Sequence, residues 1–186
     1  MIFRLSLAVI VLFYFIVKFV RIVRIMRKPA LLPRTEEERK AIRIHPEKVI
    51  QFPTYPGQKK GMRWYIVFLI FIMIVLVIGA IVQGITWLLY LYLTFMIFYG
   101  ANHFLNLVAI MQDGILSGKG FTPWHRIKSY QIKMIDINHR YYGFSKDVNH
   151  RYELSIKTKM TTIRCMITNE FVKKRVVAYL EKNMNR

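Results

Sequence analysis

The chain has 186 residues, of which 54% are apolar, and its 29 basic residues against 10 acidic residues give a formal net charge of +19. So large an apolar fraction excludes a disordered basic tail. The single cysteine, Cys165, excludes both an intramolecular disulfide and a cysteine-rich zinc site. Because the sequence shows no carboxylate pair, nucleotide-binding loop or spaced set of metal ligands, it predicts no enzyme activity, no cofactor and no metal.

The first apolar block, residues 1–20, is predicted to be a membrane span. Between residues 2 and 20 only Arg4, Ser6 and Lys18 are neither apolar nor aromatic. Both charges lie near the ends of the block, where long side chains reach the lipid headgroups. A cleaved signal peptide is the alternative, but no small-residue cleavage site follows and the next segment is strongly basic.

Residues 21–63 are predicted to form a basic, proline-rich strap. Five of the six prolines lie between Pro29 and Pro56, which resists a continuous helix. One short helix is expected where Thr35 and Glu38 have the spacing of a capping box. Four basic side chains at the start of the strap are candidate contacts for anionic lipid headgroups: Arg21, Arg24, Arg27 and Lys28. An ordinary basic flank of a span is the alternative.

Residues 64–112 contain no Asp, Glu, Lys or Arg and are predicted to form a membrane hairpin. As one helix, these 49 residues would be roughly 73 Å long, against a bilayer core of about 30 Å. We therefore expect a break at Gln83-Gly84, with spans over about 64–82 and 86–108. The alternative, a hairpin buried in a soluble core, needs more surrounding chain than this protein has.

Three polar residues interrupt the last predicted span: Asn102, His103 and Asn106. Polar side chains are costly inside a bilayer, so this cluster is a candidate ligand or proton site. Hydrogen bonding between helices is the alternative. No acidic residue lies within 64–112, which gives little support to a proton relay.

The basic residues are distributed so that both charged blocks fall on one side of the predicted membrane. Residues 21–63 carry a net charge of +8 and residues 113–186 a net charge of +9. The positive-inside rule therefore predicts a multi-pass protein of the cell membrane, with its N-terminus outside and its C-terminal domain in the cytosol. Since topology accounts for the positive charge, we expect no nucleic-acid binding.

After residue 112 the pattern changes to the alternation of half-buried strands. Tyr152, Leu154 and Ile156 alternate with polar residues, and Ile163, Cys165 and Ile167 do the same. A strand is also expected over 129–137, with a bulge near Met134-Ile135. A final amphipathic helix follows, for which Thr168 or Asn169 is the expected cap.

A short sequence, His-Arg-Tyr, occurs twice, eleven residues apart, around a loop-like stretch. The residues that it brings together are His139, Arg140, His150 and Arg151. Arginine pairs well with phosphate, so these four form a possible edge for binding an anion or a partner. An ordinary hairpin surface with cross-strand pairing is the alternative.

The segments Asp113-Gly114-Ile115-Leu116 and Phe121-Thr122-Pro123-Trp124-His125-Arg126-Ile127 resemble a pattern in bacterial membrane-anchored PH-like domains, a family largely without assigned function. There, an acidic-Gly-Ile turn follows a membrane hairpin and precedes a Trp-x-x-Ile corner. The resemblance implies a PH-like domain over 113–186, with Trp124 and Ile127 as packing residues. The expected fold is thus three membrane helices plus a small antiparallel β domain with a C-terminal helix.

These patterns favour an accessory, scaffold or regulatory subunit that presents a PH-like domain at the inner face of a bacterial membrane. The expected partners are anionic lipids of the inner leaflet and another membrane protein or a second copy. One alternative is a component of an enzyme or transporter for lipids or lipid-linked sugars that uses the Asn102, His103 and Asn106 cluster. Another is direct sensing of lipids by the tail and the basic residues after the first block.

Overall fold

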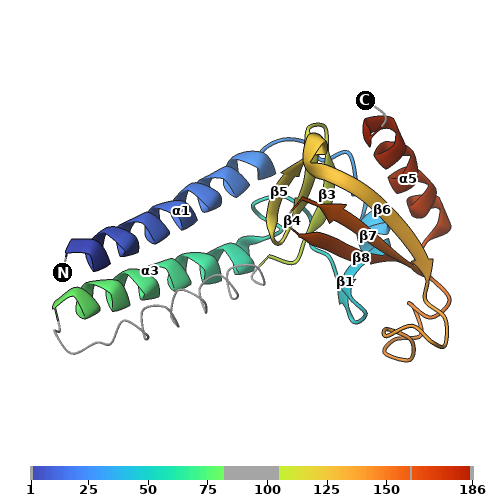
Figure 1. The fold of residues 1–186 in the computed structure, drawn as a ribbon. Coiled ribbons are helices and arrows are strands. Elements are labelled where there is room, and N and C mark those ends of the chain that lie inside the picture. The colour runs from blue at the N-terminus through green and yellow to red at the C-terminus, as the bar shows by residue number, and fades with distance from the viewer. Residues whose placement is uncertain (1, 82–104, 160, 185–186) are drawn as a thin grey trace.

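A computed structural model describes residues 2–81, 105–159 and 161–184 of the chain. Two long helices, α1 (Ile2–Met26) and α3 (Lys59–Ile81), run side by side at one end of the molecule, and a β domain occupies the other end (Figure 1). The β domain also contains α2 (Glu36–Ala41), the 3-10 turn η1 (Trp124–Arg126) and the C-terminal helix α5 (Glu170–Met184).

The β domain consists of two antiparallel sheets. The smaller sheet has the order β3-β4-β5, formed by Val108–Met111, Gly114–Ser117 and Gly120–Pro123. The larger sheet has the order β2-β1-β8-β7-β6. Its strands are β1 (Ile42–His45), β2 (Lys48–Val49), β6 (Ile127–Met134), β7 (Tyr152–Thr158) and β8 (Thr162–Ile167).

The main core lies between the two sheets and α5. Leu154 and Ile156 on β7 pack with Ile163 and Cys165 on β8, and α5 contributes buried residues such as Val176. The predicted alternation on β7 and β8 is confirmed at these positions. Met166 is different, because it lies on the outer face and is buried there beneath the segment that joins β6 to β7.

The ends of α5 and β6 settle two of the sequence predictions. Asn169 is the cap of α5, since its side-chain Oδ1 accepts a hydrogen bond from the Phe171 amide at 2.8 Å. Thr168 instead contacts the strap, with its hydroxyl donating to the Ala41 carbonyl at 3.3 Å. The bulge expected near Met134-Ile135 lies just beyond β6, which ends at Met134. There the Ile135 amide donates to the Arg151 carbonyl and the Ile135 carbonyl accepts from the His150 amide, so the extra residue is on the opposing segment, where His150 has a positive φ. A second irregularity in the pairing lies between Ile127 and Ser129.

The ends of the predicted strap belong to α1 and α3, and what remains between them, residues 29–58, is called the strap from here on. This strap is built into the β domain rather than lying beside it. Strand β1 pairs antiparallel with β8, with Ile42 opposite Ile167 and Arg43 opposite Met166. Leu32 forms a bridge to Ile110 of the smaller sheet. Four strap residues belong to the main core: Leu32, Ala41, Ile42 and Ile50. The strap therefore extends the larger sheet and helps to cover the core.

Polar contacts fix the strap at α2 and at β1. The capping box of α2 is confirmed, with the Thr35 side chain accepting from the Glu38 amide. The Glu38 carboxylate is buried and forms an ion pair with Arg175 of α5. On β1, the Arg43 guanidinium lies 2.7 Å from the Asp147 carboxylate. These pairs join segments that are more than a hundred residues apart in the sequence.

The helices α1 and α3 pack against each other through aromatic and apolar side chains. Phe15, Tyr65 and Ile72 are buried between them, and the Phe19 and Tyr65 rings lie 5.2 Å apart. Other apolar side chains of this pair, such as Phe13 and Phe71, are exposed. Among the described residues, none of the helices combines the length and the apolar character needed to cross a bilayer.

The predicted three membrane spans are therefore wrong for the described part of the chain, and so is the predicted multi-pass topology in a cell membrane. The end of the charge-free stretch shows why the argument failed. Residues 105–107 are not helical, and Val108–Met111 form strand β3, whose side chains are buried in the β domain. A strand buried on both faces lacks charge just as a membrane helix does. The rest of the third predicted span and its break at Gln83-Gly84 lie outside the described residues.

Candidate functional site

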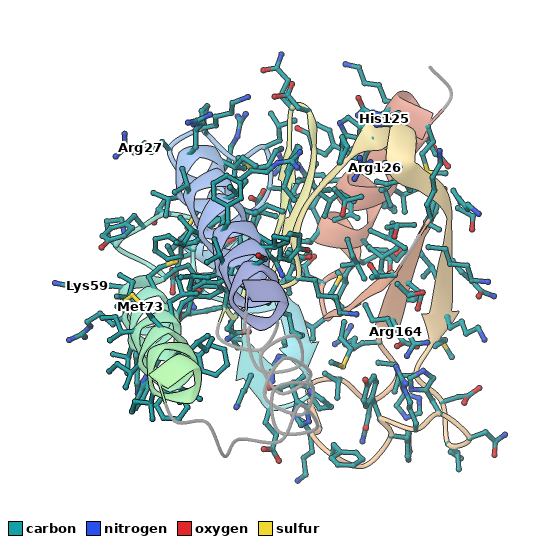
Figure 2. The ribbon with its side chains drawn as sticks, turned by 60° about the vertical axis from the view of Figure 1, so that its left-hand side comes forward. Arg27, Lys59, Met73, His125, Arg126 and Arg164 are labelled. Carbon is teal, nitrogen blue, oxygen red and sulfur yellow. The ribbon has the colours of Figure 1, made fainter. Side chains whose placement is uncertain are left out.

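The outer face of the larger sheet carries a polar groove of about 450 Å³. Four cationic side chains lie along it, against one carboxylate. Its lining comes from β6, β7, β8 and the segment after β6, and consists of Gln131, Lys133, Asn138, His139, Arg140, Glu153, Ser155, Lys157, Thr162 and Arg164. Arg164 marks the position of the groove on the sheet (Figure 2).

Strand register brings these side chains to one face. Ser155 of β7 lies opposite Gln131 of β6 on one side and Arg164 of β8 on the other. In the neighbouring rows, Lys133 is opposite Glu153 and Lys157 is opposite Thr162. Because successive side chains of a strand point to opposite faces, all these residues face away from the core.

The Glu153 carboxylate lies at one end of the groove and is only 6% exposed. Its Oε2 is 3.0 Å from His139 Nε2, and its Oε1 accepts from Arg140 Nη2 at 2.7 Å. Burial alone would raise the pKa of Glu153, but the hydrogen bonds from His139 and Arg140 outweigh it and lower this pKa below its ordinary value. Glu153 is therefore an ionised group whose charge is already matched within the protein.

Both ring nitrogens of His139 take part in hydrogen bonds within the protein. Its Nδ1 accepts from the Tyr141 amide at 3.2 Å, which leaves the ring proton on Nε2, facing Glu153. Such a ring has no free nitrogen for a metal or for proton transfer to a substrate. It fixes the segment 135–151, which packs on the sheet through buried Ile135, Val148 and Met166.

Three of the four cations are not committed to any acidic partner. Arg140 pairs with Glu153 and its guanidinium lies 4.4 Å from the centre of the Tyr141 ring. Lys133, Lys157 and Arg164, in contrast, form no ion pair within the described residues. Their charges are thus available to an anion that enters the groove.

This arrangement is suited to binding rather than to catalysis. The hydroxyl and amide side chains of Ser155, Thr162, Gln131 and Asn138 supply neutral hydrogen bonds beside the cations. In the described part of the chain, no group of three or more His, Cys, Asp or Glu side chains is placed to hold a metal ion. Cys165 is buried in the core, and burial raises the pKa of its thiol to about 12, so it is a poor nucleophile.

Half of the predicted anion edge lies in the groove. His139 and Arg140 line it, but His150 and Arg151 do not. His150 has a positive φ of 60° and its ring packs against Tyr142, with a 5.6 Å separation of ring centres. Lys133, Lys157 and Arg164 were not among the site residues predicted from the sequence. The alternation of the strands could have identified them, because these three cations occupy outward positions of the predicted strands.

The basic residues at the end of α1 lie elsewhere. Arg21 stacks over the Phe121 ring at 5.7 Å, and Lys28 Nζ lies 2.6 Å from the Asp113 carboxylate. Arg24 and Arg27 are exposed, and Figure 2 shows Arg27 on the opposite side of the molecule from Arg164. Arg21 and Lys28 therefore hold α1 against the β domain, and neither belongs to the groove.

The remaining predicted residues have structural contacts. Trp124 and Ile127 pack against the main core, and the Trp124 indole donates to the Gln112 carbonyl at 2.9 Å. The Asn106 side chain donates to the Val49 carbonyl at 2.8 Å, which ties the start of β3 to the strap. The other two members of its predicted cluster, Asn102 and His103, lie outside the described residues.

Residues 106–185 match the family model described as "Domain of unknown function (DUF5673)". The match covers less than half of the chain and leaves out the strap and the helices α1 and α3. No curated protein and no solved structure matches the chain. The PH-like resemblance therefore stays a prediction.

Proposed function

We propose that this protein is a non-enzymatic accessory or scaffold protein whose β domain binds an anionic group in the groove on β6, β7 and β8. The observation that carries the proposal is the set of three cations, Lys133, Lys157 and Arg164, that share one face without an acidic partner in the described residues. The one carboxylate of the groove, Glu153, is paired with the Arg140 guanidinium and accepts a hydrogen bond from His139, so it repels an entering anion little.

The chemistry of the groove supports binding in preference to a reaction. A catalytic histidine needs a free nitrogen near the substrate, and both nitrogens of His139 are occupied. Among the described contacts, no basic side chain forms a hydrogen bond with the hydroxyls of Ser155 or Thr162, which line the groove. Charge-assisted hydrogen bonds to lysine and arginine, by contrast, need only the geometry that the strands provide.

Titration of the full chain with two polyanions tests this proposal. The probes are inorganic tripolyphosphate and a peptide of alternating Glu and Val. Binding of each probe is measured by isothermal titration calorimetry at several salt concentrations. The double substitution Lys133→Ala/Lys157→Ala is expected to weaken binding of at least one probe about tenfold or more, because each charge-assisted contact is worth about 1.5–3 kcal/mol. Affinity should fall steadily as salt rises.

A matched control separates the groove from the general positive charge of the protein. Lys146→Ala/Lys174→Ala removes the same charge from two exposed lysines that do not line the groove. Binding by this control variant is expected to stay within about twofold of the unmodified chain. Equal loss in both double variants, or no binding of either probe, would contradict the proposal.

A further inference from the structure

Strand β6 leaves one edge of the larger sheet open beside the groove. It pairs with β7 over its whole length, from Ile127 opposite Thr158 to Met134 opposite Tyr152. Within the described residues no strand pairs with its other edge, since the sheet order ends at β6. An antiparallel edge strand presents the N–H and C=O groups of alternate residues to any extended chain that approaches it.

The open edge and the groove are parts of one surface. Gln131 and Lys133 of β6 line the groove, and Ser129 lies in the same outward register, opposite Lys157. A strand added to β6 would lie about 4.8 Å from it, and its alternate side chains would point over the same face. The added strand would therefore place one set of its side chains next to Lys133 and within reach of the groove.

Charge decides what kind of chain fits this edge. β6 contains Lys128 and Lys133 and has no acidic residue, so pairing with a second copy of itself would bring lysines together. The cations of the groove point to an acidic occupant. They also lie in three successive cross-strand rows, with Lys133 opposite Glu153, Arg164 opposite Ser155 and Lys157 opposite Ser129. Cations repeated along the strand direction suit charges repeated along an extended chain more than a single phosphate.

We propose that the partner is an acidic, extended segment of another protein that adds to β6 as a strand and directs its alternate carboxylates over the groove. This inference rests on the proposed function, because it names the carrier of the anionic group. Main-chain hydrogen bonds to β6 hold the segment, and its carboxylates meet the lysines of the groove.

Strand addition predicts an order of effects among the three cations. The added strand lies about 5 Å from β6, about 10 Å from β7 and about 14 Å from β8. Lys133 is on β6, Lys157 on β7 and Arg164 on β8. Substitution by glutamate should therefore weaken peptide binding most at Lys133, less at Lys157 and least at Arg164.

The test uses the full chain, fluorescence anisotropy and three forms of a labelled peptide of alternating Glu and Val. One form is unmodified, one is N-methylated at every Glu, and one is N-methylated at every Val. All three carry the same charge, but each methylated form loses the hydrogen-bond donors of one edge. We expect one methylated form to bind at least fivefold more weakly than the other, together with the order Lys133, Lys157, Arg164.

The outcomes separate this inference from the proposed function. Equal binding of all three peptides, or equal effects of the three substitutions, overturns strand addition but leaves anion binding in the groove intact. Binding of tripolyphosphate alone also overturns it and points to a phosphate ligand. Failure of both tripolyphosphate and the peptides to bind overturns this inference and the proposed function together.

Discussion

The strands β6, β7 and β8 of the larger sheet have two outer edges, one at β8 and one at β6, and these edges differ. Beside Met166 and Ile167 of β8, the chain's own strap adds β1 and β2, and it brings buried apolar residues such as Ile42 and Ile50 into the core. At β6, the edge has no strand partner in the described residues and carries lysines. An exposed strand edge invites unwanted pairing. This protein covers one edge with its own chain and marks the other with charge.

The comparison also shows how much of the chain the β domain needs. The family match covers 106–185, yet four core residues come from the strap. A β domain without the strap would expose the edge of β8 and part of the core. We therefore treat the strap and residues 106–185 as one folding unit, and the predictions below test this unit and its two edges.

The largest effect is expected at the covered edge. Ile42 of β1 is 2% exposed and packs in the main core, so Ile42→Ala should lower the free energy of unfolding by about 2–5 kcal/mol. Urea unfolding followed by circular dichroism measures it. The neighbouring His45 is exposed, and His45→Ala should change stability by no more than about 0.5 kcal/mol. An equally small loss for Ile42→Ala would mean that the strap is peripheral to the folding unit.

The ion pair between the strap and α5 should give the next largest effect. Arg175→Ala leaves the buried Glu38 carboxylate without its cation, and the Arg175 side chain is 31% exposed. We expect a loss of about 2–3 kcal/mol, less than for a fully buried pair because water reaches this site. A double-mutant cycle with Glu38→Gln isolates the pair. Additive losses in the cycle would show that the two side chains are not coupled.

Glu153 should give a smaller effect that depends on pH. Its folded pKa is lowered, so the ionised carboxylate stabilises the fold above the carboxyl's unfolded pKa of about 4.3, and this contribution is lost as pH falls through the folded pKa. At pH 7, Glu153→Gln should cost about 1–2 kcal/mol through its hydrogen bonds. The stability gap between the two proteins should narrow below about pH 4. A gap that widens on acidification would contradict this assignment.

The smallest effect on stability is expected at the open edge. Lys133 is exposed and has no ion pair among the described residues, so Lys133→Ala should change the free energy of unfolding by no more than about 0.5 kcal/mol. Thermal unfolding by circular dichroism is sufficient to measure it. A loss above about 1 kcal/mol would mean that β6 depends on this lysine for its structure, and binding data from the variant would then lose their meaning.

The sequence predicted local features of the β domain well. The capping box at Thr35 and Glu38, the alternation on β7 and β8 and the cap of α5 depend on residues close together in the chain. The docking of the strap depends on pairing between residues more than a hundred positions apart, and β1 is only four residues long. No local pattern identifies such a partner.

Two other errors have physical causes. The stretch without charge predicted a membrane helix as far as Val108. Absence of charge indicates that a segment is buried, but it does not distinguish burial in lipid from burial in protein. Strand β3 is buried in protein. The repeat around residues 139–151 predicted an edge for an anion or a partner, and of its four residues only His139 and Arg140 line the groove. The three cations of the groove that have no ion pair in the described part of the chain come from strands whose alignment depends on register, and register is set by the fold.

Hydrogen exchange of the full chain, measured residue by residue by nuclear magnetic resonance, tests the difference between the two edges most directly. We predict that the amides of Ile42 and Arg43 in β1 and of Met166 and Ile167 in β8 exchange as slowly as those of β7, because β1 pairs with β8 at these residues. In β6, every second amide should exchange quickly, since only alternate N–H groups point to β7. Fast exchange throughout β1, or slow exchange of every amide in β6, would contradict the account.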